Sequence, residues 1–179
     1  MLTLHSDRLL LRQLTLEDAT PTYAAWLNDP EVNRFLEVRH QPHTIETCRQ
    51  FIADTNASTN HHLFGIFLAE SGQHIGNIKL GFIDRRTSTG QVSLFLGEKR
   101  AWNHGYATEA IRLVTSFGFN QIGLIRIEAG MYDENLGSLR AFLKLGYSVE
   151  GYFRQKYILA DRRVGSFWLA VLKEEWRHG

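Results

Sequence analysis

The sequence predicts an α+β protein in which helices flank a mixed central β-sheet. Segments with the two-residue periodicity of strands alternate with segments that have the 3.6-residue periodicity of helices. Some expected strands follow one another through short turns and others are separated by a helix, so antiparallel and parallel neighbours are both expected. All three prolines precede His43, so none interrupts a helix or a central strand in the rest of the chain.

The composition fits one globular domain, which we expect to span residues 1–179. Hydrophobic residues make up 44% of the chain and charged residues 22%. A formal net charge of +1 argues against a general nucleic-acid-binding protein, and no apolar run approaches the ~20 residues of a membrane span. The single cysteine, Cys48, excludes an internal disulfide and favours a reducing compartment, so we expect a cytoplasmic protein.

Each expected element has a local signal. Strands are expected at Leu9–Leu11, His62–Glu70, His74–Asp84, Gln91–Leu96, Leu124–Tyr132, Tyr147–Phe153, Lys156–Ala160 and Gly165–Leu172. Helices are expected from Thr15 through Trp26 and at Thr44–Ser58, Tyr106–Phe119 and Asn135–Leu145.

The ends of the helices carry recognisable residues. Thr15 and Asp18 resemble a capping box at the start of the first helix, and Asn28-Asp29-Pro30 should end it and restart the chain. The last helix places Leu136, Leu139 and Leu143 on one side, and Gly146 suits its C′ position. Cys48 lies on the apolar stripe of the second helix, which favours packing over a nucleophilic role.

The segment from Lys99 to Ala110 joins a strand to a helix and suits a phosphate group. The first turn of a helix has unpaired N–H groups and a partial positive charge. Gly105 allows close approach of a ligand to the backbone, and Lys99 and Arg100 add charge. The patterns of a P-loop and of a dinucleotide-binding loop are absent, and a plain connector is the alternative.

This loop resembles the acetyl-CoA-binding loop of the Gcn5-related N-acetyltransferase (GNAT) superfamily, [QR]-x-x-G-x-[GA]. Arg100, Asn103 and Gly105 occupy its defined positions. Asn103 stands where glycine is expected, and asparagine tolerates the left-handed backbone better than most residues. The run from Trp102 to Ala110 is similar to W-G-x-G-Y-A-T-E-A, typical of the branch that contains the ribosomal-protein N-terminal (RimJ/RimL-like) acetyltransferases.

A second motif of the same branch follows about thirty residues later. Asn135 and Ser138, then Leu145-Gly146-Tyr147, then Glu150 to Arg154 resemble N-x-x-S…G-[FY]…E-G…R. The segments Asp7–Arg12 and Trp26–Val32 also suit the branch, so the resemblance covers nearly the whole chain.

The resemblance implies a GNAT domain with splayed central strands and acetyl-CoA as co-substrate. It implies direct transfer of an acetyl group to a primary amine, with backbone N–H groups near Leu94–Leu96 stabilising the oxyanion or pairing with the pantetheine arm. The residues expected to bind acetyl-CoA are Leu94, Phe95, Leu96, Arg100, Ala101, Trp102, Asn103, His104, Gly105, Tyr106, Ala107, Thr108, Asn135 and Ser138.

The proton donor for the departing thiolate is expected to be Ser138. Many superfamily members use a tyrosine at the position of Phe142, which has no proton to give. In the branch that the chain resembles, the serine matching Ser138 is the proposed donor, while a capping or packing role is the alternative. Other polar groups considered are Asn135, Tyr147 and Tyr152.

The base is expected to be Glu128, on the strand before the second motif. Glutamine stands at position 91, where the branch often has glutamate. Ordered water is an alternative route for the proton. Other candidates, each of which could equally be surface charge, are Glu37, Asp84, Glu98 and His104.

The amine acceptor is expected to be a protein N-terminus, as the resemblance implies, or a nucleotide-linked amino sugar. The latter follows from basic residues that could hold a carboxylate or diphosphate, namely Arg34, Arg39, Arg85 and Arg86. Glu37 is also expected to belong to the acceptor site. A solvated charged face is the alternative for these residues. Polyamines and aminoglycosides are disfavoured because the region is not strongly acidic.

The expected partners are acetyl-CoA and an amine, without metal, nucleic acid or membrane, and a homodimer is compatible with the sequence. The alternative function is a non-catalytic acyl-CoA-binding regulatory module.

Overall fold

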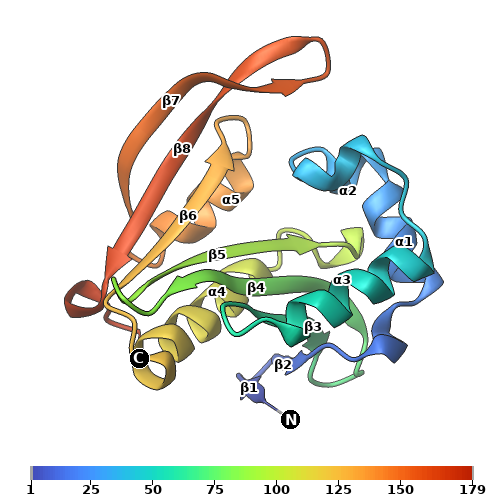
Figure 1. The fold of residues 1–179 in the computed structure, drawn as a ribbon, viewed down its shortest axis with the longest axis horizontal. Helices are drawn as coiled ribbons and strands as arrows, with labels where there is room; N and C mark the ends of the chain where they lie inside the picture. The colour runs from blue at the N-terminus through green and yellow to red at the C-terminus, as the bar shows by residue number, and fades with distance from the viewer. Residues whose placement is uncertain (1, 179) are drawn as a thin grey trace.

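The computed structural model describes residues 2–178 and has one eight-stranded sheet, in the order β1-β2-β3-β4-β5-β6-β8-β7 (Figure 1). β5 and β6 are parallel and every other neighbouring pair is antiparallel, which confirms the mixed α+β fold. The strands are β1 (Thr3–His5), β2 (Leu9–Gln13), β3 (His62–Leu68), β4 (His74–Asp84), β5 (Thr89–Leu96), β6 (Arg126–Tyr132), β7 (Ser148–Leu159) and β8 (Arg162–Leu172).

Helices lie on both faces of the sheet. They are α1 (Pro21–Asn28), α2 (Pro30–Asn33), α3 (Ile45–Ala57), α4 (Tyr106–Phe117) and α5 (Leu136–Leu143). Short turns of 3₁₀-helix are η1 (Leu16–Asp18), η2 (Glu37–His40), η3 (Lys99–Ala101) and η5 (Lys173–Glu175), and η4 (Gly118–Ile122) is a π-helical turn after α4. No helix among residues 2–178 is long and apolar enough to cross a membrane.

The helix expected from Thr15 through Trp26 is in fact two elements. The Thr15–Asp18 capping box is present, but it opens only the single turn η1. A second cap follows, because the Thr20 hydroxyl accepts a hydrogen bond from the Tyr23 N–H and Pro21 occupies the first position of α1. Asp29 then ends α1 and caps α2, as the sequence predicts.

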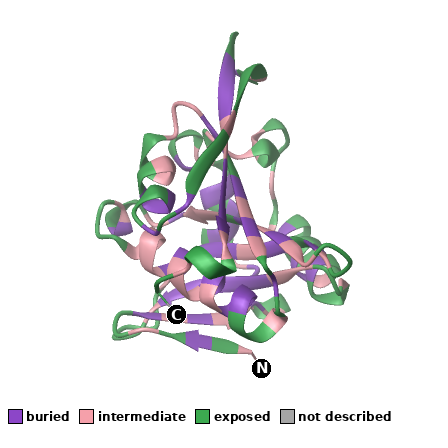
Figure 2. Ribbon diagram, turned by 90° about the vertical axis from the view of Figure 1, so that its left-hand side faces the viewer, coloured by how far each residue is buried: buried purple, intermediate pink, exposed green. Residues whose placement is uncertain are grey.

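The strands expected at Tyr147–Phe153 and Lys156–Ala160 form one long strand, β7. The polar residues between them are accommodated by register shifts, one of them between Phe153 and Tyr157, and Gln155 has a left-handed backbone (φ 53°). A bulge can insert residues without ending a strand. β7 is paired only with β8, and the hairpin of the two projects from the body of the molecule (Figures 1 and 2).

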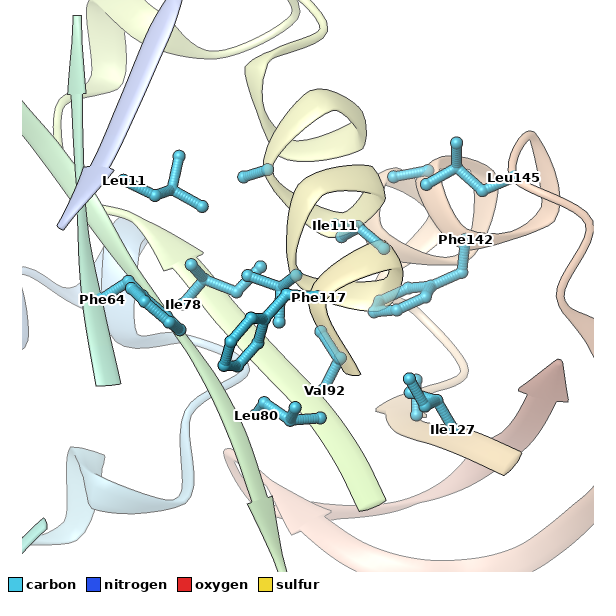
Figure 3. Packing of buried hydrophobic residues seen from close by; sticks show 14 of the residues in the cluster. Leu11, Phe64, Ile78, Leu80, Val92, Ile111, Phe117, Ile127, Phe142 and Leu145 are labelled. Atoms are coloured by element: carbon cyan, nitrogen blue, oxygen red, sulfur yellow. The ribbon is translucent and has the colours of Figure 1, made fainter. Parts of the chain in front are cut away.

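The largest core cluster lies between the sheet and α4. Ile111 and Phe117 of α4 meet Leu80 and Val92 of the central strands, and Phe142 of α5 closes one side (Figure 3). A second cluster joins α1 and α3 to the sheet and contains Cys48, which is buried. This position fits the packing interpretation of Cys48.

The apolar side expected for α5 is only partly its buried side, because Leu139 alone of the three leucines packs against the core. Leu136 and Leu143 are 49% and 44% exposed, whereas Ala141 and Phe142 are buried. Gly146 has a left-handed backbone (φ 86°) just after the helix, which matches the expected C′ role.

Candidate active site

The central strands separate after a short parallel pairing. Thr89–Gln91 of β5 pairs with Arg126–Glu128 of β6, and beyond Gln91 the two strands diverge (Figure 1). β4 remains paired with β5 as far as Leu96. The rest of β5 therefore has a strand partner on one side only, so N–H and C=O groups on its other edge are free to bind a ligand.

One cavity, of about 500 Å³, lies beside α4 and α5 and is called here the α4–α5 cavity. It is lined by Glu31, Val32, Phe35, Leu36, Leu94, Phe95, Leu96, Ala101, Trp102, Asn103, Gly105, Tyr106, Ala107, Thr108, Ile111, Asn135, Gly137, Ser138, Arg140, Ala141 and Lys144. Twelve of the fourteen residues expected to bind acetyl-CoA belong to this lining; Arg100 and His104 do not.

A second cavity, of about 520 Å³, is bounded by α1, α3, η2 and the strands β4 to β6, and is called here the α1–α3 cavity. Its lining includes Tyr23, Glu37, Val38, His43, Cys48, Phe51, Asn77, Lys79, Phe82, Ser93, Tyr132 and Tyr157.

The two cavities share a wall. Six residues line both: Phe35, Leu36, Leu94, Phe95, Asn135 and Ser138. Ser138 and Asn135 come from the start of α5 and the leucine–phenylalanine pair from the diverging edge of β5. A molecule in either cavity would therefore contact these same residues.

The loop before α4 has the backbone that the sequence predicts. Gly105 is the N-cap of α4 with a left-handed backbone (φ 83°), and Asn103 is also left-handed (φ 65°). No side chain caps the first turn of α4, which leaves its N–H groups available to a ligand. The Trp102 indole N–H donates to the carbonyl of Leu96 (2.9 Å) and so ties the loop to the end of β5.

The basic groups beside this loop differ from the expected ones. Lys99 is ion-paired with Asp29 (2.8 Å) and with Glu31, so it is not free for a phosphate. Two cations that the sequence analysis missed line the α4–α5 cavity instead, Arg140 and Lys144. Their spacing of four residues places them on one face of a helix, which is the signal that could have revealed them.

The start of α5 leaves the Ser138 hydroxyl without a capping role. The Asn135 side chain is the N-cap and accepts a hydrogen bond from the Ser138 N–H (3.2 Å). The Ser138 hydroxyl has no hydrogen-bond partner among residues 2–178, and Phe142 is buried in the core. Asn135 and Ser138 therefore present two polar groups at the shared wall.

Two tyrosines considered as donors lie elsewhere. The Tyr147 hydroxyl is buried against Thr115 (2.7 Å), and burial raises its pKa. Tyr152, in β7, donates to Asp133 (2.7 Å), which directly follows β6. Neither residue lines a cavity.

The structure does not bring Glu128 into either cavity. Its carboxylate accepts a hydrogen bond from the Nε of Arg126 (2.7 Å), and Arg126 also pairs with Glu150. The other candidates Asp84, Glu98 and His104 are outside both linings. Glu37 is the one carboxylate that lines the α1–α3 cavity.

Glu37 belongs to a polar group that includes Tyr132 of β6. The Tyr132 hydroxyl donates a hydrogen bond to Glu37, and Arg39 lies 3.4 Å from the same carboxylate. Burial, and after it the hydrogen bond to Glu37, raise the pKa of Tyr132 to about 12. Tyr132 is therefore neutral at pH 7 and remains a hydrogen-bond donor to the carboxylate.

None of the four arginines expected at the acceptor site lines the α1–α3 cavity. Arg34 pairs with Glu134 (3.0 Å), and Arg86 with Asp84 (3.7 Å). Arg39 donates to the backbone carbonyls of Leu36 and Ile158 and joins η2 to β7. Arg85 follows β4 in the turn to β5, outside the lining.

Comparison with known proteins agrees with this geometry. The family described as acetyltransferase (GNAT) domain matches residues 8–148. A protein of Bacillus licheniformis named uncharacterized N-acetyltransferase p20 is 30% identical over 98% of this chain and 99% of its own length.

Solved structures share the fold at lower identity. Spermidine N-acetyltransferase from Vibrio cholerae, in complex with CoA and spermine, has a TM-score of 0.85 at 16% identity and covers 95% of this chain and 98% of that one. Mycobacterium smegmatis RimJ, in complex with CoA-disulfide, has a TM-score of 0.80 at 18% identity and covers 97% and 87%.

The match to the family extends over most of the chain, and the full-length relative is an N-acetyltransferase by name. The splayed sheet and the cavity at the start of α4 supply the corresponding architecture. The chain belongs to the GNAT family of acetyltransferases.

Proposed function

We propose that this enzyme transfers an acetyl group directly from acetyl-CoA in the α4–α5 cavity to a primary amine in the α1–α3 cavity. The observation that carries the proposal is the shared wall, where Ser138 lines both cavities. Two substrates bound on either side of such a wall can react without a covalent enzyme intermediate.

The α4–α5 cavity has the chemistry that CoA requires. The uncapped first turn of α4 and the left-handed Gly105 suit the pyrophosphate, and Arg140 and Lys144 add positive charge. The free edge of β5 near Leu94–Leu96 suits the amides of the pantetheine arm and the oxyanion of the reacting carbonyl. Arg100 and His104 belong to the loop but lie outside the cavity lining, so the proposal gives them no contact with CoA.

The reaction forms a bond from the amine nitrogen to the carbonyl carbon and breaks the carbon–sulfur bond. The amine loses a proton and the sulfur gains one. Ser138 is the proposed donor to sulfur, because its hydroxyl lies at the shared wall and has no partner among residues 2–178; it recovers a proton through solvent. Glu37 is the proposed acceptor of the amine proton in place of Glu128, because it lines the amine cavity.

The identity of the amine is constrained by the same cavity. A polyamine is disfavoured because Glu37 is the single carboxylate of the lining and already bonds Tyr132. A nucleotide-linked amino sugar is less well supported than the sequence indicates, because the arginines that would hold its diphosphate lie outside the lining. A protein N-terminus needs no such cluster and stays among the candidates.

The remaining parts of the proposal concern the whole chain. Residues 1–179 are proposed to form one acetyltransferase domain in the cytoplasm, in keeping with a single buried cysteine. A homodimer remains a prediction that sedimentation equilibrium can check.

The test of the mechanism is Ser138→Ala. If the hydroxyl protonates the thiolate, kcat should fall ~10²-fold while KM for acetyl-CoA changes little. Ser148→Ala, on the exposed start of β7, is the matched control and should keep wild-type rates. A kcat within about threefold of wild type would remove Ser138 from the mechanism.

The alternative of a regulatory acyl-CoA-binding module has a different signature. Such a module would bind CoA by calorimetry, and no amine in a broad panel would release CoA from acetyl-CoA. Release of CoA that depends on an added amine excludes that alternative.

A further inference from the structure

Two polar residues of β4 belong to the lining of the α1–α3 cavity. Asn77 and Lys79 are alternate residues of β4, so their side chains leave the same face of the sheet at Cα positions roughly 6.6 Å apart. Both line the cavity, and neither was singled out from the sequence. The sequence feature that could have revealed them is the occurrence of polar residues at alternate positions of an otherwise apolar strand.

The orientation of the Asn77 amide is fixed by His74. The Nε2 of His74 lies 3.0 Å from the carbonyl oxygen of Gly76 and 2.7 Å from Oδ1 of Asn77. A backbone carbonyl can only accept, so Nε2 must carry the hydrogen, and the Asn77 atom that faces it must be the oxygen. The Asn77 NH₂ group therefore points away from His74.

That NH₂ group lies beside the Tyr23 hydroxyl, although the two groups make no hydrogen bond of normal geometry. Asn77 is 3% exposed, and its Nδ2 atom is buried away from the open space of the cavity. Asn77 therefore lies behind Tyr23, and Lys79 is the donor of this pair that a ligand in the cavity can reach.

Lys79 is a cation without a counter-ion. No carboxylate of residues 2–178 lies within 4.0 Å of its Nζ, which instead lies 5.4 Å from the ring centre of Phe82 and 5.8 Å from that of Phe51. Burial lowers the pKa of Lys79, and no acidic neighbour offsets this effect. An anion beside Nζ would stabilise the charged ammonium.

Apolar side chains surround the ammonium at the rim of the cavity. Phe51 is 41% exposed, Phe82 66% and Val38 39%. Phe82 also has a left-handed backbone (φ 51°), which is strained for an aromatic residue and typical of functional sites. This rim offers contact area to the apolar part of a ligand.

We propose that the amine acceptor carries a carboxylate on an apolar framework, with Lys79 as the residue that binds the carboxylate. Phe51 and Phe82 contact the apolar part, and the amine extends to the shared wall near Ser138. The inference rests on the proposed function, because it assigns the acceptor to the α1–α3 cavity. The inference disfavours polycations as acceptors, because they carry no carboxylate. It also disfavours peptide N-termini, because the carbonyl next to their amine is neutral.

The experiment compares amines that differ only in charge. Release of CoA from acetyl-CoA is measured with phenylalanine, phenylalaninamide and 2-phenylethylamine, and with spermidine and an amidated tripeptide that begins with phenylalanine. The enzymes are wild type, Lys79→Met and the control Lys156→Met. Lys156 also lies over aromatic rings, but on the β7–β8 hairpin outside both cavities.

Phenylalanine should be the best of these acceptors for wild type and Lys156→Met. Lys79→Met should lower kcat/KM for phenylalanine by roughly tenfold to hundredfold, because one partner of a charge pair is lost. The same variant should keep kcat/KM for phenylalaninamide within about threefold of wild type. A preference for the amide, the tripeptide or spermidine would overturn the inference, and so would equal losses for charged and uncharged amines.

Binding separates failure of this inference from failure of the proposed function. If no amine is acetylated, the same compounds are titrated by calorimetry into the CoA-loaded proteins. Binding of phenylalanine that is lost only in Lys79→Met would sustain the carboxylate site and reject acetyl transfer to it. Binding that is absent in wild type, or unchanged in Lys79→Met, would reject the carboxylate site.

Discussion

At the scale of single residues, two glycines have the same backbone but different surroundings. Gly105 and Gly123 have φ values of 83° and 82°. A side chain at either position would strain a left-handed backbone. Only Gly105 lines the α4–α5 cavity, where a Cβ atom would lie 3.6 Å from Arg8 Nη2; nothing lies within 4 Å of a Cβ at Gly123. The same substitution at both glycines therefore distinguishes the effect of backbone strain on stability from an effect on the bound ligand.

Gly105→Val should weaken CoA binding because the side chain keeps the pyrophosphate away from the N–H groups of α4. We expect the dissociation constant to rise about tenfold or more, which corresponds to ~1.4 kcal/mol. Gly123→Val should lose similar stability and keep CoA affinity. Calorimetry with CoA and urea unfolding measure both quantities, and equal CoA affinity in the two folded variants would contradict the placement of the pyrophosphate.

At the scale of elements, the segment from α2 to η2 is held over the cavities by the β7–β8 hairpin. Arg39 donates to the carbonyl of Leu36 (2.8 Å) and to that of Ile158 in β7 (2.7 Å), and its guanidinium lies 5.2 Å from the centre of the Tyr132 ring. Glu134 pairs with Arg34 and with Arg162 of β8. Arg34 and Arg39, which the sequence predicts to bind the acceptor, thus position the segment from α2 to η2 instead.

Arg39→Met should loosen that wall and raise the KM of every amine acceptor several-fold, whatever its charge. The loss of the hydrogen bonds to the carbonyls of Leu36 and Ile158 should also cost roughly 1–3 kcal/mol of stability. Arg86→Met is the control, because that guanidinium is exposed in the turn after β4. Steady-state rates with charged and uncharged amines check the prediction; a loss confined to anionic amines would instead assign Arg39 to direct binding.

The elements also show what can be predicted from the sequence. The left-handed backbone at Asn103 and Gly105 follows from local chemistry, so the loop before α4 is predictable. The buried side of α5 is not, because tertiary contacts bury Ala141 and Phe142 and leave Leu136 and Leu143 exposed. Glu128 illustrates the same limit. The strand that contains it is predicted correctly, but its ion pair with Arg126 depends on tertiary contacts.

At the scale of the whole molecule, the diverging strands separate two cavities and leave one wall between them. Each cavity has its own side of the structure, α4 and α5 for one and α1, α3 and η2 for the other. In the proposed mechanism the acetyl group moves from one cavity to the other beside Ser138, which lines both. The arrangement favours a complex that holds both substrates at once.

The single cysteine gives no alternative route for the acetyl group. Cys48 lines the α1–α3 cavity but is 1% exposed, and it does not line the α4–α5 cavity. Burial raises the pKa of its thiol, so the reactive thiolate is scarce at neutral pH. An acetylated enzyme intermediate on Cys48 is therefore disfavoured.

Initial rates measured over a grid of acetyl-CoA and amine concentrations should give intersecting lines in double-reciprocal plots, because both substrates must bind before transfer. Cys48→Ala should keep the intersecting pattern and a kcat within about threefold of wild type, apart from the stability lost by truncating a buried side chain. Parallel lines, or exchange of acetyl groups between CoA analogues without an amine, would show that the acetyl group is first transferred to the enzyme. In that case the shared wall would not be the path of transfer, and a nucleophile lining the α4–α5 cavity would have to be sought.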